Sequence, residues 1–174
     1  TSGTVSVSNA EGVAPSVSSD AVKSAQSQES VPKTRIERLA ERADGKRKEL
    51  RENQRGVSYF ELFGPYLAGA KNIVVKDAYV RIPYQLRNFA EFLETVLSCK
   101  DSSDEVQVHL VTGRNDPMYV QSQIDGLEQL KSIFAQLGID FTFEFSDTLH
   151  DRSITTDTGW LILPGRGLDI FQKF

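Results

Sequence analysis

The chain has 174 residues, of which 39% are hydrophobic and 25% charged, and its formal net charge is −4. These values are ordinary for a globular domain with appendages, and the net charge of the whole chain gives no signal for nucleic-acid binding. No apolar run reaches the length of a membrane span, and the first residues lack the pattern of a signal peptide. Because the chain starts with Thr1, we expect a fragment or a processed product.

Cys99 is the only cysteine. It has no partner for a disulfide within the chain and no Cys or His companions at zinc-ligand spacing, so we expect a reducing cytoplasm and no metal site. No glycine-rich nucleotide loop is present either, and we therefore expect no cofactor.

The first third of the chain is polar. Residues 1–33 are rich in Ser, Val, Ala and Gln, which predicts a disordered linker. Residues 34–56 predict a charged connecting helix that starts with a capping box of Thr34 and Glu37. Residues 33–55 carry nine basic and five acidic side chains. This excess is typical either of a solvated helix face or of a handle for an anionic partner.

Residues 57–174 alternate helices with strands. The apolar periodicity predicts helices over 58–70, 83–97 and 117–137, and strands over 73–77, 106–110, 141–145 and 160–163. This order predicts an α/β domain with a largely parallel or mixed sheet flanked by helices, ending in a hairpin-like segment. Ligands bind such sheets at the carboxyl ends of the strands.

One segment after the third strand carries the chemistry of a phosphate site. In an extended chain His150 and Arg152 project from the same face. Asp157 has the opposite parity, so a turn or bulge near 155–156 is needed to bring it round. Arg can grip phosphate oxygens and Asp can fix an imidazole tautomer. The alternative is a hydrogen-bonded structural pair at a strand end, with Asp157 as a turn residue.

Two further groups are candidates for ligand binding. The first group follows the first strand of the domain and consists of Asp77, Tyr79 and Arg81. A ligand site at the end of the sheet would include residues from this position, although Tyr79 can equally belong to the core. Gly165 and Arg166 can offer backbone N–H groups and a guanidinium to an anion, or can simply form a turn.

The His-x-Arg-x4-Asp spacing resembles the His-x-Lys-x4-Asp signature of the phospholipase D superfamily. Other pieces resemble one branch, the phospholipase D-like C-terminal domain of MIT-domain-containing proteins, over about 57–174. These pieces are Val57-Ser58-Tyr59-Phe60-Glu61-Leu62-Phe63-Gly64-Pro65-Tyr66-Leu67, Asp77-Ala78-Tyr79-Val80-Arg81 with Gln85, Leu86 and Asn88, His150-Asp151-Arg152, and Gly159-Trp160 with Gly165-Arg166-Gly167-Leu168-Asp169. Similar domains also occur at the C-terminus of bacterial Lon-related ATPases, including some linked to phage defence.

The resemblance implies a phospholipase D-like fold that often pairs as a homodimer. By position, His150 would be the nucleophile or base, Arg152 the phosphate clamp and Asp157 the group that orients the imidazole. Relatives with Arg in the Lys position are regarded as phosphoinositide-binding modules. We therefore expect a non-catalytic, phosphate-binding module at the C-terminus of a larger protein. The alternative is an active dimeric phosphodiesterase or nuclease that uses His150 as its nucleophile.

The expected partner is a phosphate-bearing ligand, either a phosphoinositide or a nucleic acid. Residues 57–174 carry ten basic and sixteen acidic side chains, which suits a small pocket better than an extended polyanion groove. Contact with a membrane surface or DNA would need help from residues 33–55.

Overall fold

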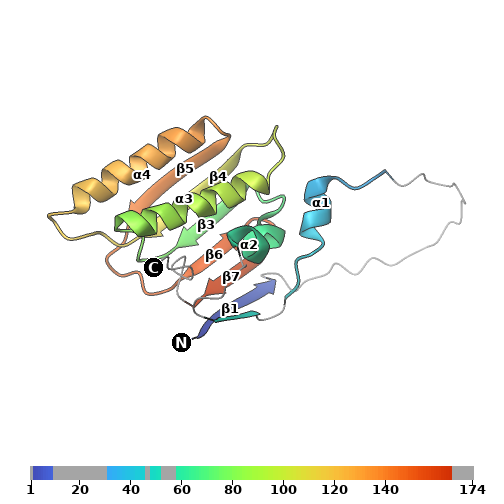
Figure 1. Cartoon of the computed structure of the whole chain (residues 1–174), viewed down its shortest axis with the longest axis horizontal. Coiled ribbons are helices and arrows are strands. Elements are labelled where there is room, and N and C mark those ends of the chain that lie inside the picture. The colour runs from blue at the N-terminus through green and yellow to red at the C-terminus, as the bar shows by residue number, and fades with distance from the viewer. Residues whose placement is uncertain (1, 10–30, 46–47, 52–57, 166–174) are drawn as a thin grey trace, which may run out of the picture.

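The computed structural model describes residues 2–9, 31–45, 48–51 and 58–165. Their seven strands form one mixed sheet in the order β2-β1-β7-β6-β3-β4-β5 (Figure 1). The strands are β1 (Ser2–Asn9), β2 (Lys48–Arg51), β3 (Asn72–Lys76), β4 (Val106–Thr112), β5 (Ile139–Phe145), β6 (Ser153–Thr156) and β7 (Trp160–Pro164). The pairs β3–β4 and β4–β5 are parallel, and the remaining neighbours are antiparallel.

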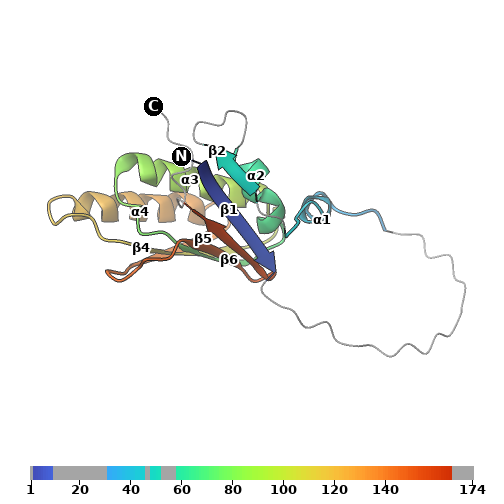
Figure 2. The ribbon, with the colours of Figure 1, turned by 90° about the horizontal axis from the view of Figure 1, so that it is seen from below.

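Helices connect these strands. They are α1 (Arg35–Ala40), α2 (Tyr59–Leu67), α3 (Pro83–Ser98) and α4 (Val120–Ala135). The long helices α3 and α4 lie side by side on the same face of the sheet (Figure 2). The prediction of an α/β domain with a mixed sheet and flanking helices is confirmed.

The alternation of side chains along the strands builds the core. In β5, Ile139 and Phe141 are fully buried beneath the helices, whereas Asp140 and Thr142 are exposed on the opposite face. The ring of Phe141 lies 5.2 Å from that of Phe89 on α3. Aromatic pairs of this kind add roughly 0.5–1.5 kcal/mol beyond the burial of their area, so they fix α3 against the sheet.

The end of the described chain is a β-hairpin. Strands β6 and β7 are antiparallel, and the turn between them closes with a 3.2 Å hydrogen bond from the N–H of Gly159 to the carbonyl of Thr156. Gly159 has a φ of 95°, which a residue with a side chain rarely adopts. The hairpin-like end expected from the sequence is present.

The linker expected over residues 1–33 needs correction at its start. Residues 2–9 form β1, which pairs with β7 through Val5 opposite Pro164 and Val7 opposite Ile162. Both valines are buried. The reason is the strict alternation of Val and Ser in this stretch, a strand pattern that the average composition conceals. Residues 10–30 lie outside the described residues.

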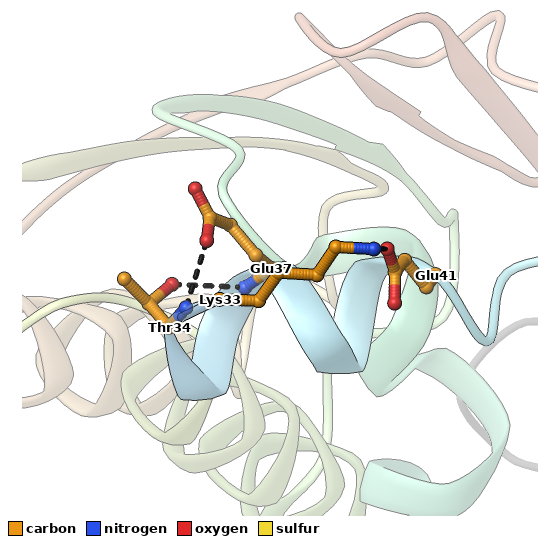
Figure 3. Close-up of polar contacts among 4 residues, drawn as sticks. All are labelled: Lys33, Thr34, Glu37 and Glu41. Atoms are coloured by element: carbon orange, nitrogen blue, oxygen red, sulfur yellow. Dashed lines mark hydrogen bonds and ion pairs between the residues drawn. The ribbon is translucent and has the colours of Figure 1, made fainter. Parts of the chain in front are cut away.

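The charged helix expected over 34–56 is also corrected. Helix α1 has only six residues, and residues 48–51 form a strand that pairs with β1. The predicted capping box is present: the N–H of Thr34 donates to the Glu37 carboxylate at 2.7 Å, and the Glu37 N–H donates to the Thr34 hydroxyl at 3.1 Å (Figure 3). Residues 46–47 and 52–57, which include the expected start of the domain, lie outside the described residues.

Candidate functional site

An open pocket of about 480 Å³ lies at the sheet edge where β3 ends and β6 begins. These two ends coincide because the strands are antiparallel, with Lys76 opposite Ser153. The lining residues are Ala78, Tyr79, Leu149, His150, Asp151, Arg152, Leu163, Pro164 and Gly165. The structure thus brings together residues that three separate segments of the sequence supply.

The guanidinium groups of two arginines lie over the ring of Tyr79. The Cζ atom of Arg152 lies 4.6 Å from the centre of the Tyr79 ring, and that of Arg81 lies 5.1 Å from it. Nη1 of Arg152 is also 3.5 Å from the carbonyl oxygen of Gly165. Among the described residues no carboxylate forms an ion pair with either arginine. The positive charge at this edge therefore has no neutralising partner in the described part of the chain.

The loop that carries Tyr79 and Arg81 is held by buried side chains. The N–H of Val80 donates to the hydroxyl of Thr112 at 3.2 Å. The side-chain oxygen of Gln85 accepts from the N–H groups of Arg81 and Ile82 at 3.0 and 3.3 Å. In an ordinary surface loop these backbone N–H groups would donate to water, whereas here they donate to side chains.

Two more buried side chains complete this frame. Gln123 on α4 donates to the carbonyl of Val80 at 2.8 Å, and the carboxylate of Asp77 accepts from the Tyr79 N–H at 2.9 Å. Four of the six buried polar side chains in the described residues therefore bind this single loop; they are Asp77, Gln85, Thr112 and Gln123. Polar groups are costly to bury unless they are hydrogen-bonded, so these four side chains hold the loop in one defined conformation.

Gly113 lets the guanidinium of Arg81 approach the backbone. A Cβ atom at Gly113 would lie 2.7 Å from the carbonyl oxygen of Ala78 and 2.7 Å from Nη2 of Arg81. That carbonyl accepts from Nε of Arg81 at 2.7 Å and from the Gly113 N–H at 3.2 Å. Arg81 is thus fixed at its Nε end, while its Cζ stays beside the Tyr79 ring.

The sequence-predicted catalytic residues are not all together. His150 lies exposed at the pocket, and within the described residues no hydrogen bond to its imidazole is present. Asp157 follows the far end of β6, where its carboxylate accepts from the N–H of Lys71 at 3.0 Å. A four-residue strand spans roughly 13 Å, so Asp157 does not reach His150 in the same chain. Asp157 therefore lies at the other end of β6 from His150, and its expected orienting role stays a prediction.

The remaining candidates have different placements. Asp77 is 3% exposed and its carboxylate supports the loop, and its expected contact with a ligand stays a prediction. Gly165 lines the pocket, and its N–H donates to the carbonyl of Thr4 at 3.0 Å, which ties the pocket wall to β1. Arg166 lies outside the described residues.

Two other reactive side chains have structural roles. His109 lies on the uncovered face of the sheet, with Nδ1 2.7 Å from the Thr142 hydroxyl and Nε2 3.6 Å from the Glu144 carboxylate. Burial raises the pKa of the Cys99 thiol to about 12, which keeps it protonated and unreactive. In the described part of the chain no cluster of three His, Cys, Asp or Glu side chains is arranged to hold a metal ion. None of the described helices combines the length and apolarity needed to cross a bilayer.

Sequence reasoning missed the frame around the loop. Thr112, Gly113 and Gln123 carry no motif of their own, and their partners are backbone groups far away in the sequence. The only available signal was a glycine placed directly after a strand, which often marks a close backbone approach.

Comparison with known proteins gives a consistent result. A family model described as the phospholipase D-like domain at the C-terminus of MIT matches residues 56–174. The chain is also similar to MIT domain-containing protein 1 of Mus musculus, with 34% identity over 139 residues that cover 76% of this chain and 54% of the mouse protein. The chain therefore spans about half the length of this relative.

Proposed function

The chain belongs to the family of phospholipase D-like domains at the C-terminus of MIT, and we propose that its pocket binds a ligand that carries a phosphate group. One observation carries the proposal: the Arg152 and Arg81 guanidiniums share the ring of Tyr79, and no described carboxylate pairs with either. Cations kept without a partner at the mouth of a pocket favour an anionic ligand.

Arginine suits this task because its planar fork can donate two parallel hydrogen bonds to phosphate oxygens. The Arg152 guanidinium lies over the Tyr79 ring, and in the proposed complex its N–H groups donate to the phosphate oxygens. Because the loop beneath Tyr79 is already fixed by Gln85 and Thr112, little ordering entropy is lost on binding. His150, at the same pocket, adds a further polar group.

We propose that the pocket binds its ligand without cleaving it. A histidine nucleophile needs a group that sets its tautomer, and Asp157 lies at the other end of β6. The chain has one such motif, so phosphodiester hydrolysis would also require a second copy to supply the acid. We expect no hydrolysis of bis(p-nitrophenyl) phosphate by the pure protein. Turnover that disappears in His150→Ala would favour the dimeric phosphodiesterase instead.

The charge of the domain bears on the size of the ligand. Residues 58–165 contain eight basic and fifteen acidic side chains, so a long polyanion would be repelled outside the pocket. The described part of residues 33–55 has six basic and four acidic side chains, and one of the six, Lys33, pairs with Glu41, so the basic excess there is small. We therefore propose recognition of one phosphate group, on a phosphoinositide or a nucleic-acid end, in the cytoplasm.

The proposal is tested by titration calorimetry with phenyl phosphate. Arg152→Ala should weaken binding by about tenfold or more, because a charged hydrogen bond contributes roughly 1.5–3 kcal/mol. Arg87→Ala removes the same charge from an exposed position on α3 and serves as the control. Equal affinity of wild type and Arg152→Ala, or an equal loss in both variants, would remove the pocket from the proposal. Soluble inositol phosphates and short oligonucleotides, compared side by side, then identify the source of the phosphate.

A further inference from the structure

We call the pocket lined by Tyr79, His150 and Arg152 the anion pocket. A second hollow, which we call the apolar groove, shares a neighbouring residue with it. It has a volume of about 360 Å³ and sits where α3 and α4 begin. Its lining residues are Arg81, Ile82, Pro83, Leu86, Asn115, Tyr119, Ser122 and Gln123. Arg81 belongs to both places, because it lines the groove and also stacks on Tyr79 of the anion pocket.

The groove is bordered by large apolar side chains that water reaches. Ile82 and Tyr119 line the groove and are 38% and 54% exposed, and Met118, which precedes Tyr119 in the chain, is 81% exposed. Together with Tyr79, they make up four of the eight large hydrophobic side chains that are exposed in the described residues, and all four lie on the two loops after β3 and β4. Single exposed apolar residues are ordinary, but four on two loops whose residues line a hollow indicate an interaction site.

We propose that the apolar groove binds a helical segment of a partner protein, with two apolar side chains of that helix inside the groove and an acidic side chain at Arg81. The proposal does not require the phosphate ligand, although Arg81 belongs to both sites. A groove between two helix ends suits a third helix, whose side chains one turn apart form a matching ridge. Its volume lies near the lower end of roughly 300–1,000 Å³ for ligand pockets, which suits side chains better than a cofactor.

Positive charge at one wall of the groove determines where an acidic side chain of the partner helix would bind. The guanidinium of Arg81 stands at one wall, and the N-terminal ends of α3 and α4 direct their positive dipole ends to the same region. Tyr119, at the N-cap of α4, makes no side-chain capping hydrogen bond to the helix start. A carboxylate on the bound helix complements all three features.

The groove is formed before any partner arrives. The N–H of Asn115 donates to Gln123 at 2.8 Å, and the Asn115 side chain donates to the carbonyl of Arg81 at 3.2 Å. Gln123 donates to the carbonyls of Val80 and Gly113 at 2.8 and 2.9 Å. These bonds join the two loops that form the walls, so binding requires little rearrangement.

A peptide fits these observations better than a lipid bilayer. The apolar surface is concave, whereas residues that enter a bilayer project from a convex surface. Residues 58–165 contain seven more acidic than basic side chains, and an anionic bilayer would repel such a domain. Tyr, Met and Arg are also the residue types enriched at protein interfaces.

The test is selection of peptides from a random 12-residue display library. The wild-type chain is the bait, and Ser122→Trp, which fills the groove from an exposed position on α4, is the counter-selection. Ser132→Trp places the same ring at another exposed position of α4 and is the control. We expect sequences with two bulky apolar residues three or four apart and a nearby Asp or Glu. Their affinity should fall at least tenfold in Ser122→Trp and stay unchanged in Ser132→Trp.

A second readout locates the peptide. Met118 is the only methionine of the chain and precedes the lining residue Tyr119, so a ¹³C-methyl methionine label gives one signal next to a lining residue of the groove. This signal should shift with the selected peptide and should not shift with phenyl phosphate. Arg152→Ala should leave peptide binding intact, which separates this site from the phosphate pocket. Failure to enrich peptides against Ser122→Trp, or insertion of Met118 into vesicles of anionic phospholipid with no peptide binding, would overturn the proposal.

Discussion

The guanidinium of Arg152 stacks on the ring of Tyr79, with 4.6 Å between Cζ and the ring centre. Tyr79 comes from the loop after β3, and Arg152 comes from the residue before β6. The contact therefore joins two antiparallel neighbours at one sheet edge, and it places a charged group of the His-x-Arg motif over a loop with a fixed shape.

The first prediction concerns the aromatic ring itself. Tyr79→Ala should weaken phenyl phosphate binding about twofold to fivefold, because an exposed cation–π contact contributes roughly 0.5–1 kcal/mol. Tyr79→Phe keeps the ring and should bind nearly as well as wild type. Calorimetry on both variants measures the difference. Equal losses in both would mean that the hydroxyl, rather than the ring, carries the effect.

The second prediction concerns the close approach at Gly113. Gly113→Ala should lower the free energy of unfolding by about 1–3 kcal/mol, because its Cβ would overlap the Ala78 carbonyl and the Arg81 guanidinium. Phosphate binding should also weaken as Arg81 is displaced. Gly45→Ala is the control, since a Cβ there meets nothing within 4 Å. Urea unfolding measures the free energy of unfolding of both variants. An unchanged value for Gly113→Ala would contradict the close approach of the Ala78 carbonyl and the Arg81 guanidinium to Gly113.

The sequence predicted most of the fold because the signals were local. Helical spacing marked the buried faces of α3 and α4, and alternation marked β4 and β5. Residues 2–9 were missed because the composition of the whole N-terminal segment outweighed the short Val-Ser alternation within it. Residues 48–51 were missed because a charged stretch has no apolar pattern to distinguish a strand from a helix, and its pairing depends on β1.

The site was predictable only in part for a similar reason. The sequence predicted His150 and Arg152 from their chemistry and spacing and Tyr79 from its place after a strand, and all three line one pocket. The position of Asp157 depended on the path of β6, which four residues of sequence do not specify. The stacking of two arginines on one ring is a tertiary contact that neither spacing nor composition encodes.

The third prediction concerns the buried amide of Gln123. Gln123→Leu should lower the free energy of unfolding by at least about 3 kcal/mol, because it leaves the carbonyls of Val80 and Gly113 and the N–H of Asn115 without their partner at about 1–3 kcal/mol each. Gln129→Leu, at an exposed position of the same helix, should change stability by less than about 0.5 kcal/mol. Thermal and urea unfolding measure both, and similar values for the two variants would contradict the role of Gln123.

The fourth prediction concerns Cys99 and pH. Burial raises the pKa of this thiol from an ordinary 9.0 to about 12, and the charge of Arg35 lowers it to a smaller extent. The native state therefore prefers the protonated thiol. This preference stabilises the fold fully below pH 9 and is lost as the pH rises from about 9 towards 12, where the unfolded thiol ionises first.

Comparison with Cys99→Ala isolates this effect from other groups that titrate at high pH. At pH 7 the wild type should be the more stable protein, because the alanine leaves part of the buried site unfilled. At pH 10 its advantage should shrink by about 1 kcal/mol, since one pH unit above the ordinary thiol pKa corresponds to about 1.4 kcal/mol. Urea unfolding at both pH values gives the two differences. An advantage that stays constant would show that the thiol ionises equally easily in the folded and unfolded chain, as would rapid alkylation of the native protein by iodoacetamide at pH 8.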